Sequence, residues 1–173
     1  MENKKGLSSI IATLMLILLT LVLVGILWTV ITNLFNKNIS DTESCFDIFD
    51  KVQVNEQYTC FNATTSELQF SISMGDISVS EVLIAISGNG QKKSFKLSND
   101  DQTFNFLRPY NGNYNANVKL PLNNSGLTYF YNLSSQGFSG KPDKIELAPV
   151  IKGTQCDVSD STTEIIYCTS LVN

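Results

Sequence analysis

The chain contains no histidine among its 173 residues. This absence excludes the Ser-His-Asp and Cys-His arrangements of hydrolases and the usual nitrogen ligand of zinc. Glycine-rich loops of the P-loop or dinucleotide-binding type are also missing. The sequence therefore predicts a protein that is not an enzyme and that holds no cofactor and no metal. A secreted hydrolase that uses only carboxylates is the weaker alternative.

Charge is scarce as well, since only 16% of the residues are charged and the net charge is −4. A nucleic-acid-binding protein usually carries a basic stripe, so we expect no nucleic-acid partner. Charged residues are absent altogether from residues 7–36, which lie between Lys5 and Lys37. A bilayer needs about 20 apolar residues as helix, whereas residues 7–35 would extend roughly 44 Å. The sequence predicts a transmembrane helix over 7–36 with length to spare.

The long apolar run also lacks the features of an ordinary secretory signal. Such a signal has an apolar region of about 7–15 residues, followed by a small-residue A-x-A-like cleavage site. Here the run is twice as long, and no A-x-A site closes it. Instead it is entered through Lys4-Lys5-Gly6-Leu7, where a peptidase at the cytoplasmic face could take an extended segment. The entrance distinguishes this helix from a plain anchor.

The segment from Lys4 to Thr13, KKGLSSIIAT, is followed by LMLILLTLVLVGILW. It resembles the N-terminal segment of archaeal type IV pilins and archaellin-like proteins, the class III signal peptide family. The resemblance covers about 30 of the 173 residues. Members often carry proline where this chain has Ser9, and bacterial relatives carry glutamate where it has Ile11. The missing glutamate points to the archaeal branch.

The resemblance implies a leader peptide at 1–6 and cleavage between Gly6 and Leu7 by a prepilin-type peptidase. It also implies that helices from many copies, or from other pilins, bundle into the core of a surface filament. Lys4 and Lys5 place the N-terminus of the precursor in the cytoplasm and the later residues outside the cell. The predicted assembly contacts come from one set of apolar residues on the helix: Leu14, Leu16, Ile17, Leu21, Leu23, Val24, Ile26, Leu27 and Ile31. The alternative is an uncleaved, single-pass, membrane-anchored extracellular binding domain.

Cysteine occurs four times and never as C-x-x-C, which disfavours a metal site. Outside the cell an even count indicates two disulfides, for which three pairings exist. We expect Cys45–Cys60 and Cys156–Cys168, because each pair is close in sequence and lies in strand-like surroundings.

After Lys37 the sequence changes character. Residues 37–44 are polar and predict a short hinge, and residues 45–173 alternate apolar with polar residues in short runs. Gly88-Asn89-Gly90 predicts a hairpin turn between two of these runs. About nine strands at this spacing indicate a sandwich or a barrel, of which we expect the sandwich. The predicted fold class is α+β: a long N-terminal apolar helix followed by an extracellular, all-β, immunoglobulin-like sandwich head.

The head carries several candidate surface sites. N-x-S/T sequons mark four glycosylation candidates: Asn38, Asn62, Asn123 and Asn132. Residues 104–117, FNFLRPYNGNYNAN, combine Arg108, Tyr110 and Tyr114 with asparagine and glycine, a composition typical of recognition loops. Such a loop could bind surface glycans, a neighbouring subunit or another surface, or be an ordinary hairpin loop whose tyrosines lie on the domain.

Acidic residues cluster at 99–101 and at 157–164. A calcium site would need about six oxygen ligands with a defined spacing, and neither cluster has it. We therefore expect solvated turns at both places.

Overall fold

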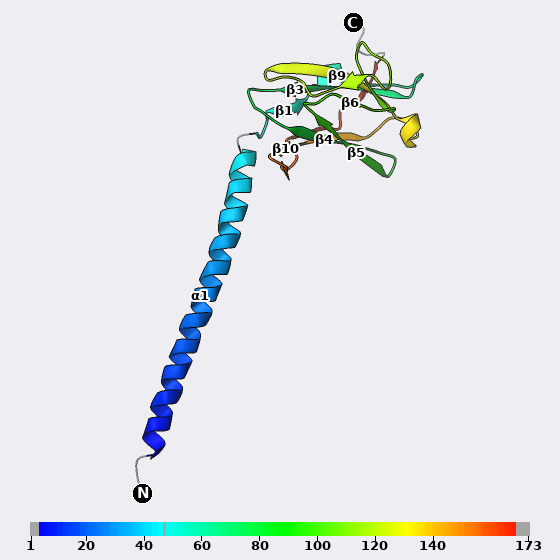
Figure 1. Ribbon diagram of the computed structural model, residues 1–173. Coiled ribbons are helices and arrows are strands. Elements are labelled where there is room, and N and C mark those ends of the chain that lie inside the picture. Colours follow the sequence, from blue (N-terminus) through cyan, green and yellow to red (C-terminus); the bar gives the residue numbers. More distant parts are fainter. Residues whose placement is uncertain (1–3, 47, 169–173) are drawn as a thin grey trace. The chain divides into compact units, whose positions relative to one another are not determined.

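The computed structural model describes the backbone of residues 4–46 and 48–168, and the side chains within these ranges except those of 4–9, 36–44 and 46. One long helix precedes a β-rich head, as Figure 1 shows. The chain divides into two compact units, with the boundary between Thr42 and Glu43. The predicted α+β class, with an apolar N-terminal helix and a sandwich-like head, is confirmed.

The helix α1 spans Lys4–Phe46, so it is longer than the sequence predicted. The expected end at residue 36 is wrong, and the backbone of the predicted hinge at 37–44 is helical. Polarity alone does not end a helix, and residues 37–44 contain no proline and no glycine to break it. The boundary between the two units nevertheless falls inside the predicted hinge.

Within the described residues, the head has two main sheets and a small one. The first sheet has the order β13 (Ile166–Tyr167), β2 (Cys60–Asn62), β3 (Glu67–Met74), β9 (Ser125–Asn132), β7 (Leu107–Pro109), with β1 (Val52–Val54) also paired to β3. The second has the order β11 (Thr154–Gln155), β10 (Lys144–Ile151), β4 (Glu81–Gly88), β5 (Gln91–Ser98), with β12 (Asp160–Thr162) also paired to β10. Strands β6 (Gln102–Thr103) and β8 (Asn117–Val118) form the small sheet, and the short 3₁₀ helices are η1 (Glu56–Tyr58) and η2 (Ser134–Gln136).

The core lies between the two main sheets. Alternate residues of β3 and β4, such as Phe70 and Ile84, are fully buried, as the period of a half-buried strand requires. The predicted hairpin joins β4 to β5 through Asn89 and Gly90, whose φ angles of 51° and 75° are those of a type I′ turn. This turn is confirmed.

The first and last segments of the head lie side by side. Strand β13 pairs in parallel with β2, with Ile166 opposite Cys60. Asp160 in β12 accepts a hydrogen bond from the backbone N–H of Val54 at 2.8 Å. The hydroxyl of Ser159 donates to the carbonyl of Val52 at 3.0 Å. Residues about one hundred positions apart are therefore neighbours.

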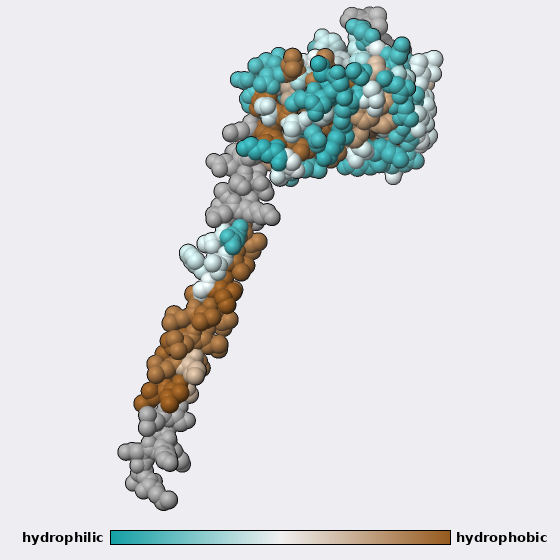
Figure 2. All heavy atoms as spheres, viewed as in Figure 1, coloured by the Kyte–Doolittle hydropathy of each residue, from teal (hydrophilic) through white to brown (hydrophobic). Residues whose placement is uncertain are grey.

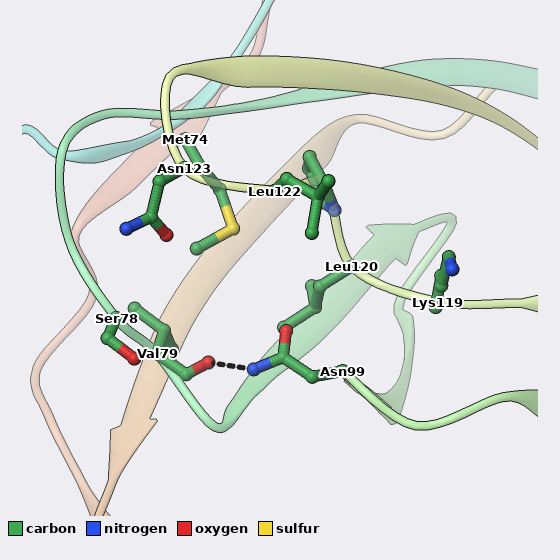
Figure 3. A pocket seen from close by; sticks show the side chains of 9 residues that line it. Met74, Ser78, Val79, Asn99, Lys119, Leu120, Leu122 and Asn123 are labelled. Atoms are coloured by element: carbon green, nitrogen blue, oxygen red, sulfur yellow. Dashed lines mark hydrogen bonds between the residues drawn. The ribbon is translucent and has the colours of Figure 1, made fainter.

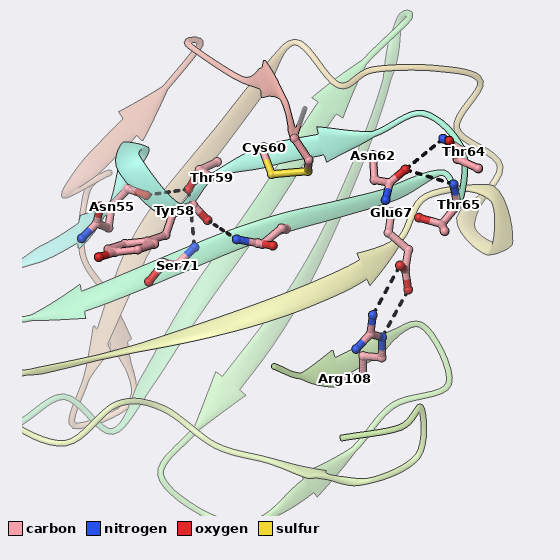
Figure 4. The surroundings of a disulfide bond; sticks show 12 residues. Asn55, Tyr58, Thr59, Cys60, Asn62, Thr64, Thr65, Glu67, Ser71 and Arg108 are labelled. Carbon is pink, nitrogen blue, oxygen red and sulfur yellow. Dashed lines mark hydrogen bonds and ion pairs between the residues drawn. A yellow bond between two sulfur atoms is a disulfide. The ribbon is translucent and has the colours of Figure 1, made fainter. Parts of the chain in front are cut away.

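This arrangement overturns the predicted disulfide pairing. The two disulfides are Cys45–Cys156 and Cys60–Cys168, with sequence separations of 111 and 108 residues. Figure 4 shows the surroundings of the disulfide at Cys60. Closeness in sequence was the wrong guide, because the sheets place the first segment of the head beside its last.

Candidate functional site

The apolar part of α1 is the first candidate site. Residues Ile10–Phe35 form a helix long and apolar enough to cross a membrane, with a mean hydropathy of 3.0 and none of it buried. Figure 2 shows hydrophobic side chains along this segment. The nine predicted assembly residues are all 44–64% exposed. A helix that is apolar all round needs lipid or other apolar helices around it.

The few hydroxyls within this segment need no outside partner. Thr13 and Thr20 donate to the carbonyls of Ile10 and Ile17 at 2.9 and 2.8 Å. Thr29 and Thr32 bond in the same way to earlier carbonyls of the helix. Because an unpaired polar group costs several kcal/mol in lipid, these internal bonds suit the helix to a bilayer and to an apolar protein core.

The proposed cleavage position lies in the first turns of α1. Gly6 and Leu7 are helical, whereas the sequence predicted an extended segment for the peptidase. The first four N–H groups of a helix have no intrahelical acceptor, so its first turn opens at little cost. Access to the bond after Gly6 therefore requires only local unwinding.

The second candidate site is the loop predicted for recognition. Arg108, in β7, forms two bonds to the carboxylate of Glu67 in β3: its Nε lies 3.2 Å from Oε1, and its Nη2 lies 3.3 Å from Oε2 (Figure 4). Its guanidinium carbon lies 4.0 Å from the ring centroid of Phe130 in β9. A charge paired with a carboxylate and stacked on an aromatic ring is not free to bind an anion. Arg108 thus holds the loop in place.

The structure separates the two tyrosines of this loop. Tyr114 is half-buried, and its hydroxyl donates to Glu67, so it belongs to the same cluster as Arg108. Tyr110 is 59% exposed, and its ring stacks on Phe130 with centroids 5.8 Å apart. Sequence reasoning missed Glu67 and Phe130, since only the register of β3, β9 and β7 brings them to the loop.

The pKa values of Glu67 and Tyr114 in this cluster differ from their ordinary values. Burial alone would raise the pKa of Glu67, but hydrogen bonds from Tyr114 and Arg108 and the charge of Arg108 hold that pKa below its ordinary value. Burial and the neighbouring carboxylate raise the pKa of Tyr114 to about 12. At neutral pH the cluster therefore consists of a carboxylate, a guanidinium and a neutral phenol.

The stability of the head should depend on this carboxylate. Since its pKa is lower in the folded chain than in the unfolded one, Glu67 stabilises the head fully above the unfolded value of about 4.3. The contribution is lost as the pH falls below that value. We expect Glu67→Gln to cost about 2 kcal/mol at pH 7, with a smaller difference from the wild type at pH 3.

The measurement is denaturant unfolding of the full chain in detergent between pH 7 and pH 3. Tyrosine circular dichroism should report the head, because the chain's single tryptophan, Trp28, lies in α1. Glu164→Gln, at an exposed position without a salt bridge in the described residues, is the matched control. An unfolding difference for Glu67→Gln that stays constant down to pH 3 would contradict the assignment.

The sequons are placed differently from one another. Asn62 and Asn132 are half-buried at the ends of β2 and β9, and both accept local hydrogen bonds through Oδ1. Asn123 is exposed in the loop before β9. The side chain of Asn38 lies outside the described residues.

Side chains of the two acidic clusters form hydrogen bonds with backbone groups of the head. Asp160 accepts hydrogen bonds from the N–H groups of Val54 and Ser161, and Asn99 donates to the carbonyl of Val79 at 2.6 Å. Within the described residues, no group of three or more histidine, cysteine, aspartate or glutamate side chains could hold a metal ion.

Asn99 also lines a cavity of about 280 Å³ beside Met74, Val79, Leu120 and Leu122 (Figure 3). Of the predicted site residues, only Asn123 lies on its wall. The cavity therefore adds no site to those predicted from the sequence.

Comparison with known proteins adds no relative. No family model, no curated protein and no solved structure matches this chain.

Proposed function

We propose that this chain is a structural subunit of an archaeal type IV pilus-like surface filament, with an adhesive head. One observation carries the proposal: a helix whose first residues are Lys4-Lys5-Gly6-Leu7 and whose apolar part is exposed over Ile10–Phe35. The helix exceeds the length that a bilayer needs. Its extra length has a use if the helix later packs among copies of itself.

The mechanism has three steps. The precursor inserts with Lys4 and Lys5 in the cytoplasm and the head outside, as the positive-inside rule predicts. A prepilin-type peptidase then cuts after Gly6 and removes both lysines. The shortened helix leaves the bilayer and packs with the helices of other copies or other pilins, and burial of apolar surface contributes about 25 cal/mol per Å².

The internal hydrogen bonds of the threonines support this sequence of events. A helix that moves from lipid to a protein core meets no water to pair its polar groups in either place. The bonds from Thr13, Thr20, Thr29 and Thr32 to carbonyls of the same helix stay intact in both surroundings. The transfer therefore leaves no hydroxyl of these residues unpaired.

An antibody against the head tests the proposal on intact cells. We expect it to label thin surface filaments along their length in electron micrographs, and we expect the filaments to vanish when the gene for this chain is deleted. Label spread evenly over the cell membrane, with no filament marked, would favour the alternative. That alternative is an uncleaved, single-pass, membrane-anchored binding domain, and the exposed Tyr110 of the loop is the observation that favours it.

A further inference from the structure

The loop between β7 and β8 presents polar side chains on a rigid base. Asn111, Asn113 and Asn115 are all exposed, whereas the alternating residues Gly112 and Tyr114 are half-buried. The amides of these three asparagines form no side-chain hydrogen bond to any described residue. They therefore offer three free donor–acceptor groups in the same loop as the exposed ring of Tyr110.

The backbone of this loop is held at several points. Gly112 donates to the carbonyl of Pro109 at 3.1 Å, and Tyr110 donates to the carbonyl of Thr128 at 3.1 Å. Arg108 donates to the carbonyl of Gly112 at 3.4 Å. A Cβ at Gly112 would lie 2.6 Å from Cγ of Pro109, so only glycine fits this close turn. A loop anchored in this way loses little conformational entropy when it binds.

The chemistry of the exposed groups indicates the ligand. Residues 109–117 carry no charge, and the adjacent Arg108 is neutralised by Glu67. Anionic ligands need free cations, which the loop does not offer. Neutral saccharides present hydroxyls that pair with amides and flat C–H faces that pack on an aromatic ring.

We propose that this loop is a binding site for a neutral saccharide, in which Tyr110 stacks on a sugar ring and Asn111, Asn113 and Asn115 bond to hydroxyls. Arg108, Tyr114 and Glu67 are positioning residues that hold the loop without touching the ligand. Phe130 supports the ring of Tyr110 from the sheet. The proposal extends the adhesive part of the proposed function, and many copies along one filament would raise a weak affinity through avidity.

An array of immobilised oligosaccharides tests the site with the full chain in detergent micelles. The probes are uncharged chains of hexoses and N-acetylhexosamines, with sialylated and sulfated chains beside them. We expect retention of the wild type on neutral probes and an affinity at least about tenfold weaker for Tyr110→Ala. Tyr58→Ala removes a tyrosine that is 51% exposed elsewhere on the head and should bind as the wild type does.

Three results would overturn the proposal: equal retention of the wild type and Tyr110→Ala, retention on acidic probes alone, and no retention of the wild type on any neutral probe. Tyr110-dependent self-association without saccharide retention would also overturn it, because the loop would then join copies of the chain. Thermal unfolding of each variant establishes that the head is folded. An absence of saccharide binding would not bear on filament formation. An uncut precursor would contradict the proposed filament but would not change the array result.

Discussion

Replacement of Gly6 with valine is expected to leave the chain uncut in the membrane and to abolish the filament. A peptidase that cuts after residue 6 must take the backbone closely, and a β-branched side chain obstructs that approach where glycine does not. An uncut chain also keeps Lys4 and Lys5. Burial of these charges in an apolar filament core is unfavourable without partners, so the helix should stay in the bilayer.

The measurement combines the intact mass of the membrane-bound chain with electron microscopy of the cell surface. Gly25→Val is the matched control for processing, because a Cβ at Gly25 meets no atom within 4 Å and lies far along α1 from the cleaved bond. We expect the control to be cut as the wild type is. Filaments built from uncut Gly6→Val chains would refute the processing step.

Loss of the disulfides is expected to be the largest change in the stability of the head. The pairs Cys45–Cys156 and Cys60–Cys168 cross in the sequence, so each bond shortens the loop that the other closes. With one bond in place, the second closes an effective loop of about 27 residues, which corresponds to about 3.5 kcal/mol by the chain-entropy model. Removal of both should cost about 8 kcal/mol.

A cost of about 8 kcal/mol lies within the usual range of total stability, so the chain without both disulfides should be largely unfolded at 37 °C. The variants are Cys45→Ser with Cys156→Ser, Cys60→Ser with Cys168→Ser, and all four together. Denaturant unfolding of the full chains in detergent measures the differences. A quadruple variant as stable as the wild type would contradict the estimate.

Digestion without reduction tests the pairing itself. Trypsin cuts at Lys37, Lys51, Lys92 and Lys152, and no lysine or arginine separates Cys156 from Cys168. The crossed pairing therefore holds three tryptic peptides together, whereas the local pairing would release the peptide after Lys152 with its own internal bond. A second cut after Glu164 then separates Cys156 from Cys168 and distinguishes the crossed pairing from the nested one, Cys45–Cys168 with Cys60–Cys156.

Local patterns in the sequence predicted the parts of the fold that local forces determine. The charge-free run predicted most of α1, and Asn89-Gly90 predicted the type I′ turn between β4 and β5. The polar segment at 37–44 misled: its asparagine, serine, threonine and aspartate are weak helix formers, but it contains no proline or glycine, and the helix continues to Phe46. The helix end at Phe46 has no glycine or proline to mark it, since the next glycine is Gly75 and the first proline is Pro109.

Contacts between distant segments were beyond the reach of these patterns. Cys45 lies next to Cys156 because β12 lies beside β1. Neither segment has a local sequence pattern that predicts this contact. Composition selected Arg108, Tyr110 and Tyr114 as one group, but the register of the sheet divides them. Arg108 and Tyr114 bond to Glu67 and support the loop, whereas Tyr110 stays exposed.

The central claim is that α1 serves first as a membrane anchor and then as an assembly element. The mature N-terminus tests it most directly. Protein sheared from the surface of intact cells should be measured as an intact mass and fragmented from its N-terminal end. The account predicts a chain that begins at Leu7; surface protein that still begins at Met1 would contradict it.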